Sequence, residues 1–372
     1  MAEAKKKQLT GISWEDFKAL SPADKVGYLS DDERILHVLL AQQFDRKRLD
    51  EIGHLATCVR RIAKSEDGMT FLQRQLSHKR AMLYFTQPSS RTFLSFCAAC
   101  QILGMQIGEV RDASVSSEFK GESREDSVRT FSSYFDLIVM RTELAGFVEK
   151  MAWIISNSER TVPVINAGSA KDQHPTQALL DIYTLQRSFE KSGGIDGKTV
   201  LFVGDLARGR TVRSLSSLLT RYCNVRQIFV APPHLQIGED ILADLRASGI
   251  SHDVRTDLEP CIPEADAIYM TRIQREWDAK VPDGQMSFAD TQMSLAGYSF
   301  GLKHLSMLKD GAVLMHPFPR TGEISPEVDH DHRAVYWRQM RNGMWARVAL
   351  IAGMFAKDSA ILDYYNRLPG DK

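Results

Sequence analysis

The sequence lacks an excess of charge of either sign and any long apolar run. Its 372 residues include 47 Lys+Arg and 47 Asp+Glu, so the formal net charge is zero. Proteins that coat nucleic acid or anionic membranes need a broad basic field, and this balance argues against both classes. Apolar runs such as 348–352 are far shorter than the roughly 20 residues that a membrane-spanning helix requires. The basic N-terminus precedes no apolar segment, so no secretory signal is predicted.

Cysteine is scarce in the chain. Five cysteines, an odd number, fit free thiols in a reducing cytoplasm better than a disulfide framework, and we expect a cytoplasmic location. Cys97 and Cys100 form a C-x-x-C within a predicted helix over 95–103. We interpret this pair as buried packing, with a redox pair as the alternative.

Short apolar segments of β type alternate with helical patterns along most of the chain. Eight strands are predicted, at 81–85, 106–110, 137–141, 163–166, 199–204, 227–231, 267–271 and 312–316. Strands that are apolar on both faces and alternate with helices are typical of parallel sheets. We therefore predict an α/β fold of two doubly wound parallel-sheet domains. Two interdomain helices, over 175–190 and 335–356, are expected to join them, with the active site in the cleft. Ser13, followed by an acid three residues later, predicts the start of a short helix. A helical pattern is also predicted from residue 34 onward.

In such folds ligands bind beyond the carboxyl ends of the strands. The first predicted strand is followed by residues 86–92, Thr-Gln-Pro-Ser-Ser-Arg-Thr. Ser89 and Ser90 at a helix start leave backbone N–H groups free for an anion, and Arg91 offers a phosphate two parallel hydrogen bonds. N-capping by either serine explains this motif equally well when it is taken alone.

Two further strand ends carry polar side chains. Arg141 ends the third strand, where a charge is costly unless it faces a pocket. His174 precedes Pro175, a residue suited to the first helical position, and Gln177 lies one turn inside that helix. A capping role is the simpler alternative for His174.

The fifth strand leads into a loop that nearly matches a phosphate-binding motif. Gly204, Gly209 and Thr211 have the spacing of G-x-x-x-x-G-K-[ST], but Arg210 stands in place of the lysine. Arginine is not equivalent to that lysine, and no G-x-G-x-x-G occurs in the loop. Nucleotide binding is therefore weakly supported.

Six basic side chains lie at or shortly after the ends of the predicted strands. They are Arg91, Arg141, Arg210, Arg272, Lys120 and His174. This set suits ligands with several phosphate or carboxylate groups. The sequence offers no paired acids for glycoside chemistry and no nucleophile–base dyad. The segment 329–332, Asp-His-Asp-His, is only a weak metal signal, so neither a metal nor a cofactor is expected.

Five motifs in order carry a resemblance to a known family. Residues 85–92 resemble the carbamoyl-phosphate signature of the aspartate/ornithine carbamoyltransferase family, and they are followed by His-Pro-Thr-Gln at 174–177, Gly-Arg-Thr at 209–211, Thr-Arg-Ile-Gln at 271–274 and His-Pro-Phe-Pro-Arg at 316–320. The resemblance implies a carbamoyl-phosphate-binding domain over 34–174 with the C-terminal helix 345–372. It also implies an aspartate-binding domain over 175–344, and leaves 1–33 as an N-terminal extension of unknown role.

Within the family, the motif at 316–320 resembles the aspartate type, whereas ornithine enzymes carry a cysteine motif there. The resemblance implies transfer of the carbamoyl group of carbamoyl phosphate to the α-amine of L-aspartate in de novo pyrimidine biosynthesis. It also implies a homotrimer with shared active sites, without nucleic acid or membrane partners. Regulatory or other pathway chains stay open as further partners.

The resemblance implies a role for each site residue. The catalytic set is Arg91, Thr92, Lys120, Arg141 and His174. Carbamoyl phosphate is assigned Ser89, Ser90, Arg91, Thr92, Arg141, His174, Gln177, Phe318 and Pro319, and aspartate is assigned Ser116, Lys120, Arg210, Arg272 and Gln274. Ser116 and Lys120 are expected to enter the site from a neighbouring subunit.

Three positions depart from the family pattern. Gln87 replaces the usual Glu or Lys, Phe93 replaces an Arg, and Trp277 stands where an Arg is expected. Gln87 in particular implies that domain closure is weaker or differently built. These departures leave a carbamoyltransferase for another amino acid as an alternative. The N-terminal extension leaves a second, a catalytically silent relative that acts as a scaffold.

Overall fold

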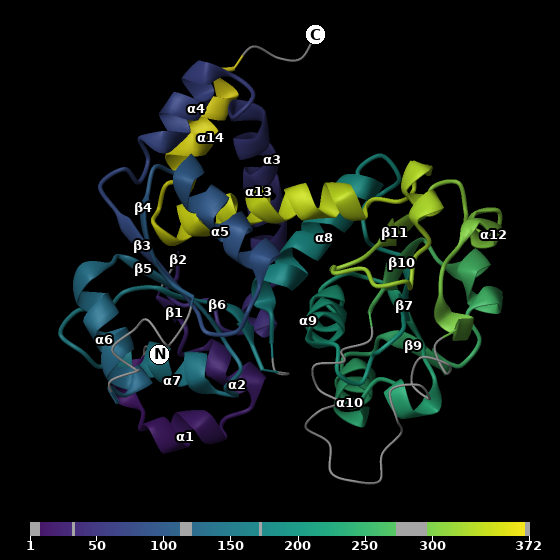
Figure 1. Cartoon of the computed structure of the whole chain (residues 1–372), viewed down its shortest axis with the longest axis horizontal. Coiled ribbons are helices and arrows are strands. Elements are labelled where there is room, and N and C mark those ends of the chain that lie inside the picture. Colours follow the sequence, from purple (N-terminus) through teal and green to yellow (C-terminus); the bar gives the residue numbers. More distant parts are fainter. Residues whose placement is uncertain (1–7, 32–33, 112–120, 171–172, 273–295, 369–372) are drawn as a thin grey trace, which may run out of the picture. The chain divides into compact units, whose positions relative to one another are not determined.

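The computed structural model describes the chain except for residues 1–7, 32–33, 112–120, 171–172, 273–295 and 369–372 (Figure 1). The chain divides into two compact units, one formed by Met1–Leu180 with Asn342–Lys372 and the other by Asp181–Arg341. Helices α8 (Pro175–Phe189) and α13 (Tyr336–Met354) each contain residues of both units.

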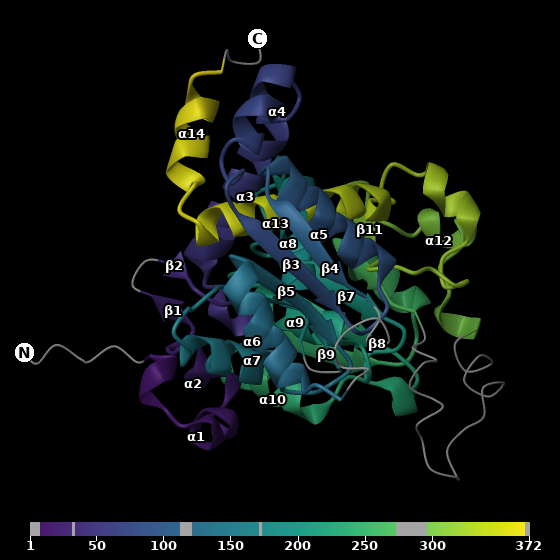
Figure 2. The same cartoon turned by 60° about the vertical axis from the view of Figure 1, so that its left-hand side comes forward.

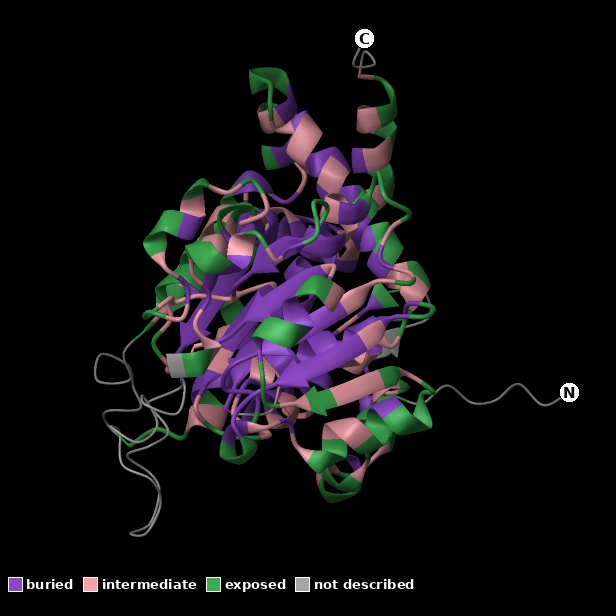
Figure 3. Ribbon diagram, turned by 90° about the vertical axis from the view of Figure 1, so that its right-hand side faces the viewer, coloured by how far each residue is buried: buried purple, intermediate pink, exposed green. Residues whose placement is uncertain are grey.

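The first unit is built on a parallel sheet with the strand order β4-β3-β5-β6 (Figure 2). The strands are β3 (Arg80–Phe85), β4 (Gln106–Val110), β5 (Leu137–Thr142) and β6 (Val164–Ser169). The longer helices are α3 (Arg46–Ile62), α4 (Glu66–Gln73), α5 (Ser90–Ile102), α6 (Arg124–Tyr134), α7 (Phe147–Ser156) and α14 (Asp358–Asn366). The strands β3, β5 and β6 are almost entirely buried, as a sheet covered on both faces requires, whereas the edge strand β4 is partly exposed (Figure 3).

The second unit holds a parallel sheet with the order β11-β10-β7-β8-β9. Its strands are β7 (Thr199–Val203), β8 (Arg226–Val230), β9 (Ser251–Arg255), β10 (Ala267–Met270) and β11 (Val313–Met315), with helices α9 (Arg210–Leu219), α10 (Glu239–Ala247) and α12 (Leu302–Leu305). Two parallel sheets with helices confirm the predicted doubly wound α/β fold. The strand β9 was missed, because at the sheet edge its polar residues stay partly exposed and lack the apolar pattern.

The helical pattern predicted from residue 34 is wrong at its start. Arg34–Ile35 forms β2, which pairs with β1 (Ser30–Asp31), and α3 begins only at Arg46. After β2 the chain is extended at Val38, whose N–H donates to the carbonyl oxygen of Val164 at 2.9 Å, and it then forms a short 3-10 helix over Ala41–Gln43. Long-range pairing with the edge of β6 therefore overrides the local apolar spacing.

The N-terminal segment, residues 8–31, contains two short α-helices, α1 (Trp14–Ala19) and α2 (Pro22–Val26), after a 3-10 turn at Leu9–Gly11. The hydroxyl of Ser13 accepts the N–H of Asp16 at 3.2 Å, which confirms the helix start predicted there. Ser21 caps α2 in the same way, with Pro22 at the first helical position.

This N-terminal segment packs against α7. The ring of Phe17 is fully buried in the core cluster that includes apolar residues of α7. The indole Nε1 of Trp153 donates to the carbonyl oxygen of Ile12 at 2.9 Å, and Lys25 Nζ lies 2.6 Å from a carboxylate oxygen of Glu149. The segment is therefore an integral part of the first unit.

His37 is a buried neutral imidazole at the edge of the first sheet. Its Nδ1 accepts the N–H of Val164 at 3.1 Å, so the proton is on Nε2, which donates to Ser156 Oγ at 2.9 Å. Burial lowers the pKa of His37 from 6.5 to about 3.

This burial predicts an acid-sensitive fold. Between about pH 6.5 and 3 the unfolded chain binds a proton at His37 that the folded chain does not bind. The free energy of unfolding should therefore fall as the pH drops through this window, by up to about 1.4 kcal/mol per pH unit. Urea denaturation of the parent and of His37→Gln, which lacks this proton, should give a flatter pH profile for the variant. Exposed His332→Gln is the control, and equal slopes for parent and His37→Gln would contradict the prediction.

None of the helices in the described ranges is long and apolar enough to cross a membrane. All five cysteines are free. Burial raises the pKa of Cys100 to about 12, so this thiol stays protonated, in keeping with packing and against redox exchange.

Candidate active site

The carboxyl ends of β3 and β5 lie where the strand order of the first sheet reverses. From β3 the chain moves to β4 on one side, whereas β5 and β6 follow on the other. Open parallel sheets bind ligands at such a switch point. Phe85, the last residue of β3, pairs with Arg141, and the N–H of Thr86 donates to the Arg141 carbonyl oxygen at 3.0 Å. The sheet thus brings the segment 86–92 and Arg141 together.

The start of α5 offers polar groups that the helix itself does not use. Ser89 is the N-cap residue, but its hydroxyl makes no capping hydrogen bond. Ser90 and Arg91 are exposed in the first turn, and Thr92 is buried beside them. The first N–H groups of a helix have no intrahelical partner and carry positive potential. This helix start is therefore suited to an anion, and the capping alternative does not apply to the Ser89 side chain.

Arg141 and the segment after β3 are braced by neighbouring groups. Arg141 Nη1 donates to the carbonyl oxygen of Ala167 at 3.1 Å. Glu143 accepts from Thr86 Oγ1 at 3.2 Å and from Arg124 Nη1 at 3.0 Å. Burial opposes ionisation of Glu143, but backbone and Arg124 hydrogen bonds hold its pKa below the ordinary value. Sequence reasoning missed this brace, since an acid two residues after a strand carries no signal of its own.

His174 lies directly before α8 and is 3% exposed. Its carbonyl oxygen accepts the N–H groups of Gln177 at 3.0 Å and Ala178 at 3.2 Å, so the His174 backbone closes the helix start. Thr176 Oγ1 lies 3.5 Å from ring Nδ1, a contact in which either atom can be the donor. The side chain of Gln177 is buried in the same turn.

In the second unit the strand order reverses between β7 and β10. Arg210 begins α9 after β7, and Arg272 follows β10. The N–H of Thr271 donates to the carbonyl oxygen of Val203 at 2.8 Å, which joins the two strand exits. Gly204 permits this approach, because its φ is +114° and a Cβ there would lie 2.6 Å from the Thr271 carbonyl oxygen. Arg210 and Arg272 are therefore brought to one switch point.

The turn after β11, next to β10 in the sheet, presents Phe318 and Pro319. Phe318 has a φ of +54°, a left-handed conformation that its surroundings must impose on a non-glycine residue. Its N–H donates to His316 Nδ1 at 2.8 Å, and His316 Nε2 donates to Glu323 at 2.6 Å. Burial opposes ionisation of Glu323, but the His316 hydrogen bond keeps its pKa below the ordinary value. The Phe318 ring also packs on Trp337, with centroids 4.9 Å apart.

A buried hydrogen-bond network holds the backbone at the start of this turn in place. Gln339 accepts the N–H of His316 at 2.9 Å and donates to Asp181 at 2.6 Å. Asp181 also accepts from the hydroxyl of Tyr269 at 2.8 Å. Sequence reasoning missed these residues, although a polar side chain inside an otherwise apolar helical pattern is a usable signal.

Three assigned site residues, Ser116, Lys120 and Gln274, lie outside the described residues. The metal-like segment 329–332 has another role. Asp329 accepts from Arg320 Nη2 at 3.1 Å, and Asp331 accepts from Arg333 at 2.8 Å. Among the described residues, no group of three or more His, Cys, Asp or Glu side chains is arranged to hold a metal ion.

Family models built on known proteins match sequence in both units. The family model for the carbamoyl-P binding domain of aspartate/ornithine carbamoyltransferase matches residues 36–187, and the model for the Asp/Orn binding domain matches 196–354. The chloroplastic aspartate carbamoyltransferase of Arabidopsis thaliana is 39% identical over 315 residues, which cover 84% of this chain and 76% of that protein. The multifunctional protein pyr1-3 of Dictyostelium discoideum is 37% identical over 86% of this chain, which spans 13% of that protein.

Among solved structures, aspartate transcarbamoylase from Trypanosoma cruzi in complex with N-(phosphonacetyl)-L-aspartic acid is similar, with a TM-score of 0.73 and 34% identity. The match covers 85% of this chain and 94% of that one. The family models begin at residue 36, so the N-terminal segment packed on α7 lies outside them. Because the two models together match most of the chain in order, it belongs to the aspartate/ornithine carbamoyltransferase family.

Proposed function

We propose that this chain transfers the carbamoyl group of carbamoyl phosphate to the α-amine of L-aspartate, giving N-carbamoyl-L-aspartate and phosphate in de novo pyrimidine biosynthesis. One observation carries the proposal: each sheet presents arginines at its switch point, Arg91 and Arg141 in the first unit and Arg210 and Arg272 in the second. Both substrates are anions. Relatives named aspartate carbamoyltransferase support the same reaction.

The first unit is assigned carbamoyl phosphate. The free N–H groups at the start of α5, with Ser89, Ser90 and Arg91, bind the phosphate. Arg141, Thr92 and His174 donate hydrogen bonds to the carbamoyl oxygen, which stabilise the oxyanion of the tetrahedral intermediate. His174 suits this task, because an imidazole ring carries an N–H donor in either tautomer. Gln177 orients the carbamoyl amide.

The second unit is assigned aspartate. Arg210 and Arg272, with Gln274, bind its two carboxylates, and Ser116 and Lys120 complete the set. The carbonyl oxygens around Phe318 and Pro319 contact carbamoyl phosphate and receive the amine. The amine attacks the carbamoyl carbon, the carbon–oxygen bond to phosphate breaks, and the departing phosphate accepts the proton. The protein contributes mainly charge neutralisation and positioning.

The choice of amine substrate follows from charge. The distal group of ornithine is a cation that prefers carboxylates, whereas Arg210 and Arg272 are themselves cations. The test measures phosphate release from carbamoyl phosphate with aspartate, ornithine or an acylated ornithine. Release with aspartate alone is expected. Release with another amine and none with aspartate would instead support the alternative motivated by Gln87, Phe93 and Trp277. No release with any amine would support a silent scaffold.

We further propose a homotrimer with active sites shared between neighbouring subunits, in the cytoplasm, where five free cysteines fit a reducing compartment. Arg91→Ala and Lys120→Ala should each be inactive alone. When equal amounts exchange subunits, about a quarter of the sites should combine two intact residues, because the two contributing chains are chosen independently. Phosphate release should recover to about that fraction of the parental rate.

The control for this mixing experiment is Arg91→Ala mixed with the double variant Arg91→Ala/Lys120→Ala, which rebuilds no complete site. Native mass spectrometry of the mixed sample establishes that subunits have exchanged. Exchange without recovered activity would count against a shared site.

A further inference from the structure

Three arginines lie together in the second unit, away from both switch points along the chain. Arg187 is in the last turn of α8, and Arg338 and Arg341 lie three residues apart near the start of α13. Residues three apart are neighbours on a helix surface. Arg338 Nη2 donates to Ser188 Oγ at 3.2 Å, which attaches α13 to the turn that carries Arg187. We name Arg187, Arg338 and Arg341 the arginine trio.

No carboxylate neutralises the arginine trio. Among the described residues, none of the three has a carboxylate oxygen within 4.0 Å. Arg187 Nε is buried and has no hydrogen-bond partner among those residues. A buried guanidinium N–H without an acceptor is costly, so an acceptor from outside the chain would be favourable.

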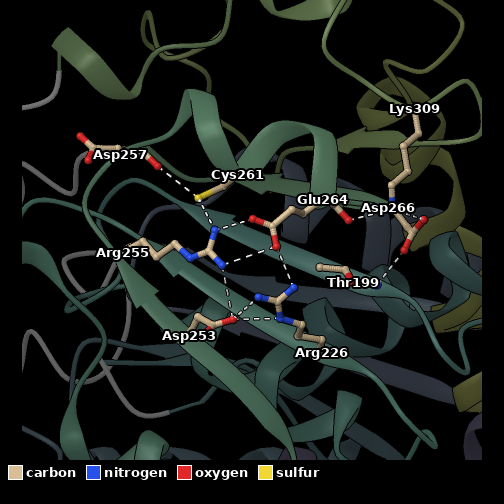
Figure 4. Close-up of polar contacts among 9 residues, drawn as sticks. All are labelled: Thr199, Arg226, Asp253, Arg255, Asp257, Cys261, Glu264, Asp266 and Lys309. Carbon is tan, nitrogen blue, oxygen red and sulfur yellow. Dashed lines mark hydrogen bonds and ion pairs between the residues drawn. The ribbon is translucent and has the colours of Figure 1, made fainter.

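Elsewhere the same unit pairs neighbouring arginines with acids. In Figure 4, Arg226 and Arg255 are bridged by Glu264, which lies 2.7 Å from Arg226 Nη1 and 2.5 Å from Arg255 Nη1. Asp253 accepts from Arg226 Nε at 2.9 Å. Hydrogen bonds that the guanidinium groups donate to these acids raise the pKa of both arginines. The arginine trio has no such arrangement.

Helix electrostatics explain only part of the arginine trio. A cation in the last turn of a helix interacts favourably with the helix dipole, which accounts for Arg187. Arg338 lies in the first turn of α13, where the dipole repels a cation. Arg338 is an exposed residue, and partial desolvation together with the charges of Arg187 and Arg341 holds its pKa below the ordinary value. Three like charges are therefore kept close together at a position that the helix dipole does not favour.

We propose that the arginine trio binds a small phosphate-bearing anion, at a site separate from the residues assigned to carbamoyl phosphate and aspartate. Guanidinium groups match phosphate oxygens through paired hydrogen bonds. Three unneutralised cations suit more than one negative charge, so the ligand class is a pyrophosphate or the phosphate chain of a nucleotide. The anion would relieve the repulsion between Arg338 and its two neighbours.

Isothermal titration calorimetry with inorganic pyrophosphate tests this site. The parent is compared with R338Q/R341Q and with the control R74Q/R129Q, which removes the same charge at exposed arginines of the first unit. In the parent and the control we expect one site that the R338Q/R341Q protein lacks or binds at least about tenfold more weakly, a loss typical of a charge-assisted pair. A parallel titration with ATP distinguishes a nucleotide phosphate chain from the free ion.

Titration of R91A with pyrophosphate distinguishes binding at the arginine trio from binding at the active site. R91A should keep pyrophosphate binding at the arginine trio, whether or not the proposed reaction is correct. Without ligand, R338Q/R341Q should have a melting temperature no lower than that of the parent, because the variant loses repulsion between cations. Pyrophosphate should raise the melting temperature of the parent more than that of R338Q/R341Q. The same pyrophosphate stoichiometry and affinity in R338Q/R341Q as in the parent would overturn the proposal. If the double variant does not fold, R341Q at an exposed position gives the same comparison.

Discussion

An Arg141→Ala enzyme should release phosphate from carbamoyl phosphate and aspartate about 10²–10³-fold more slowly than the parent at saturating substrate. The lost guanidinium is anchored by the Ala167 carbonyl oxygen at 3.1 Å, beside the start of α5. A donor held in place in this way stabilises charge that develops only in the transition state, so its loss lowers kcat more than it raises KM.

The matched control for this prediction is Arg129→Ala. Arg129 is an exposed arginine on α6 of the same unit, so its loss removes one charge without touching a strand end. Steady-state kinetics of both variants, with circular dichroism to establish folding, make the comparison. A folded Arg141→Ala enzyme with a kcat within twofold of the parent would remove Arg141 from the catalytic set.

Phe17→Ala should lower the free energy of unfolding by about 3–5 kcal/mol. The ring is 0% exposed and lies among apolar residues of α7 and the N-terminal segment. Its removal leaves a cavity in addition to the lost transfer free energy, because neighbouring helices relax only in part. Urea denaturation at neutral pH measures the change as a lower midpoint.

Tyr134→Ala is the control for Phe17→Ala. This aromatic side chain is 58% exposed on α6, and its truncation should change the free energy of unfolding by about 0.5 kcal/mol or less. If Phe17→Ala and the parent share the same midpoint, the N-terminal segment does not contribute to the folded core in solution.

The parts of the fold that were predictable depend on short-range patterns. β5 and β7 are apolar runs that stay buried on both faces, so a local stretch of sequence was enough to identify each strand. Ser13 was identified as a helix start because an N-cap acts over three residues. The strand β9 and the extended chain near Val38 depend on pairing with distant strands, and local sequence cannot report that pairing.

The candidate site was likewise predictable from the sequence only in part. The helix start at Ser89–Thr92 and the turn at Phe318 were recognisable, because each is a contiguous motif. The groups that brace them were not. Gln339 and Asp181, which share a hydrogen bond of 2.6 Å, are 158 positions apart in the chain. Glu143 braces the segment after β3 only because β3 and β5 are neighbours in the sheet.

By itself the sequence determined the fold class, the family resemblance and the sign of charge in the site, because each depends on residue type and local order. The tertiary structure alone decided which strand ends share a switch point, through the order of the strands in each sheet. It also showed that residues 8–31 belong to the core of the first unit, because burial is a property of the folded chain. The arginine trio likewise exists only in three dimensions, since the hydrogen bond between Arg338 and Ser188 joins positions that lie 150 residues apart.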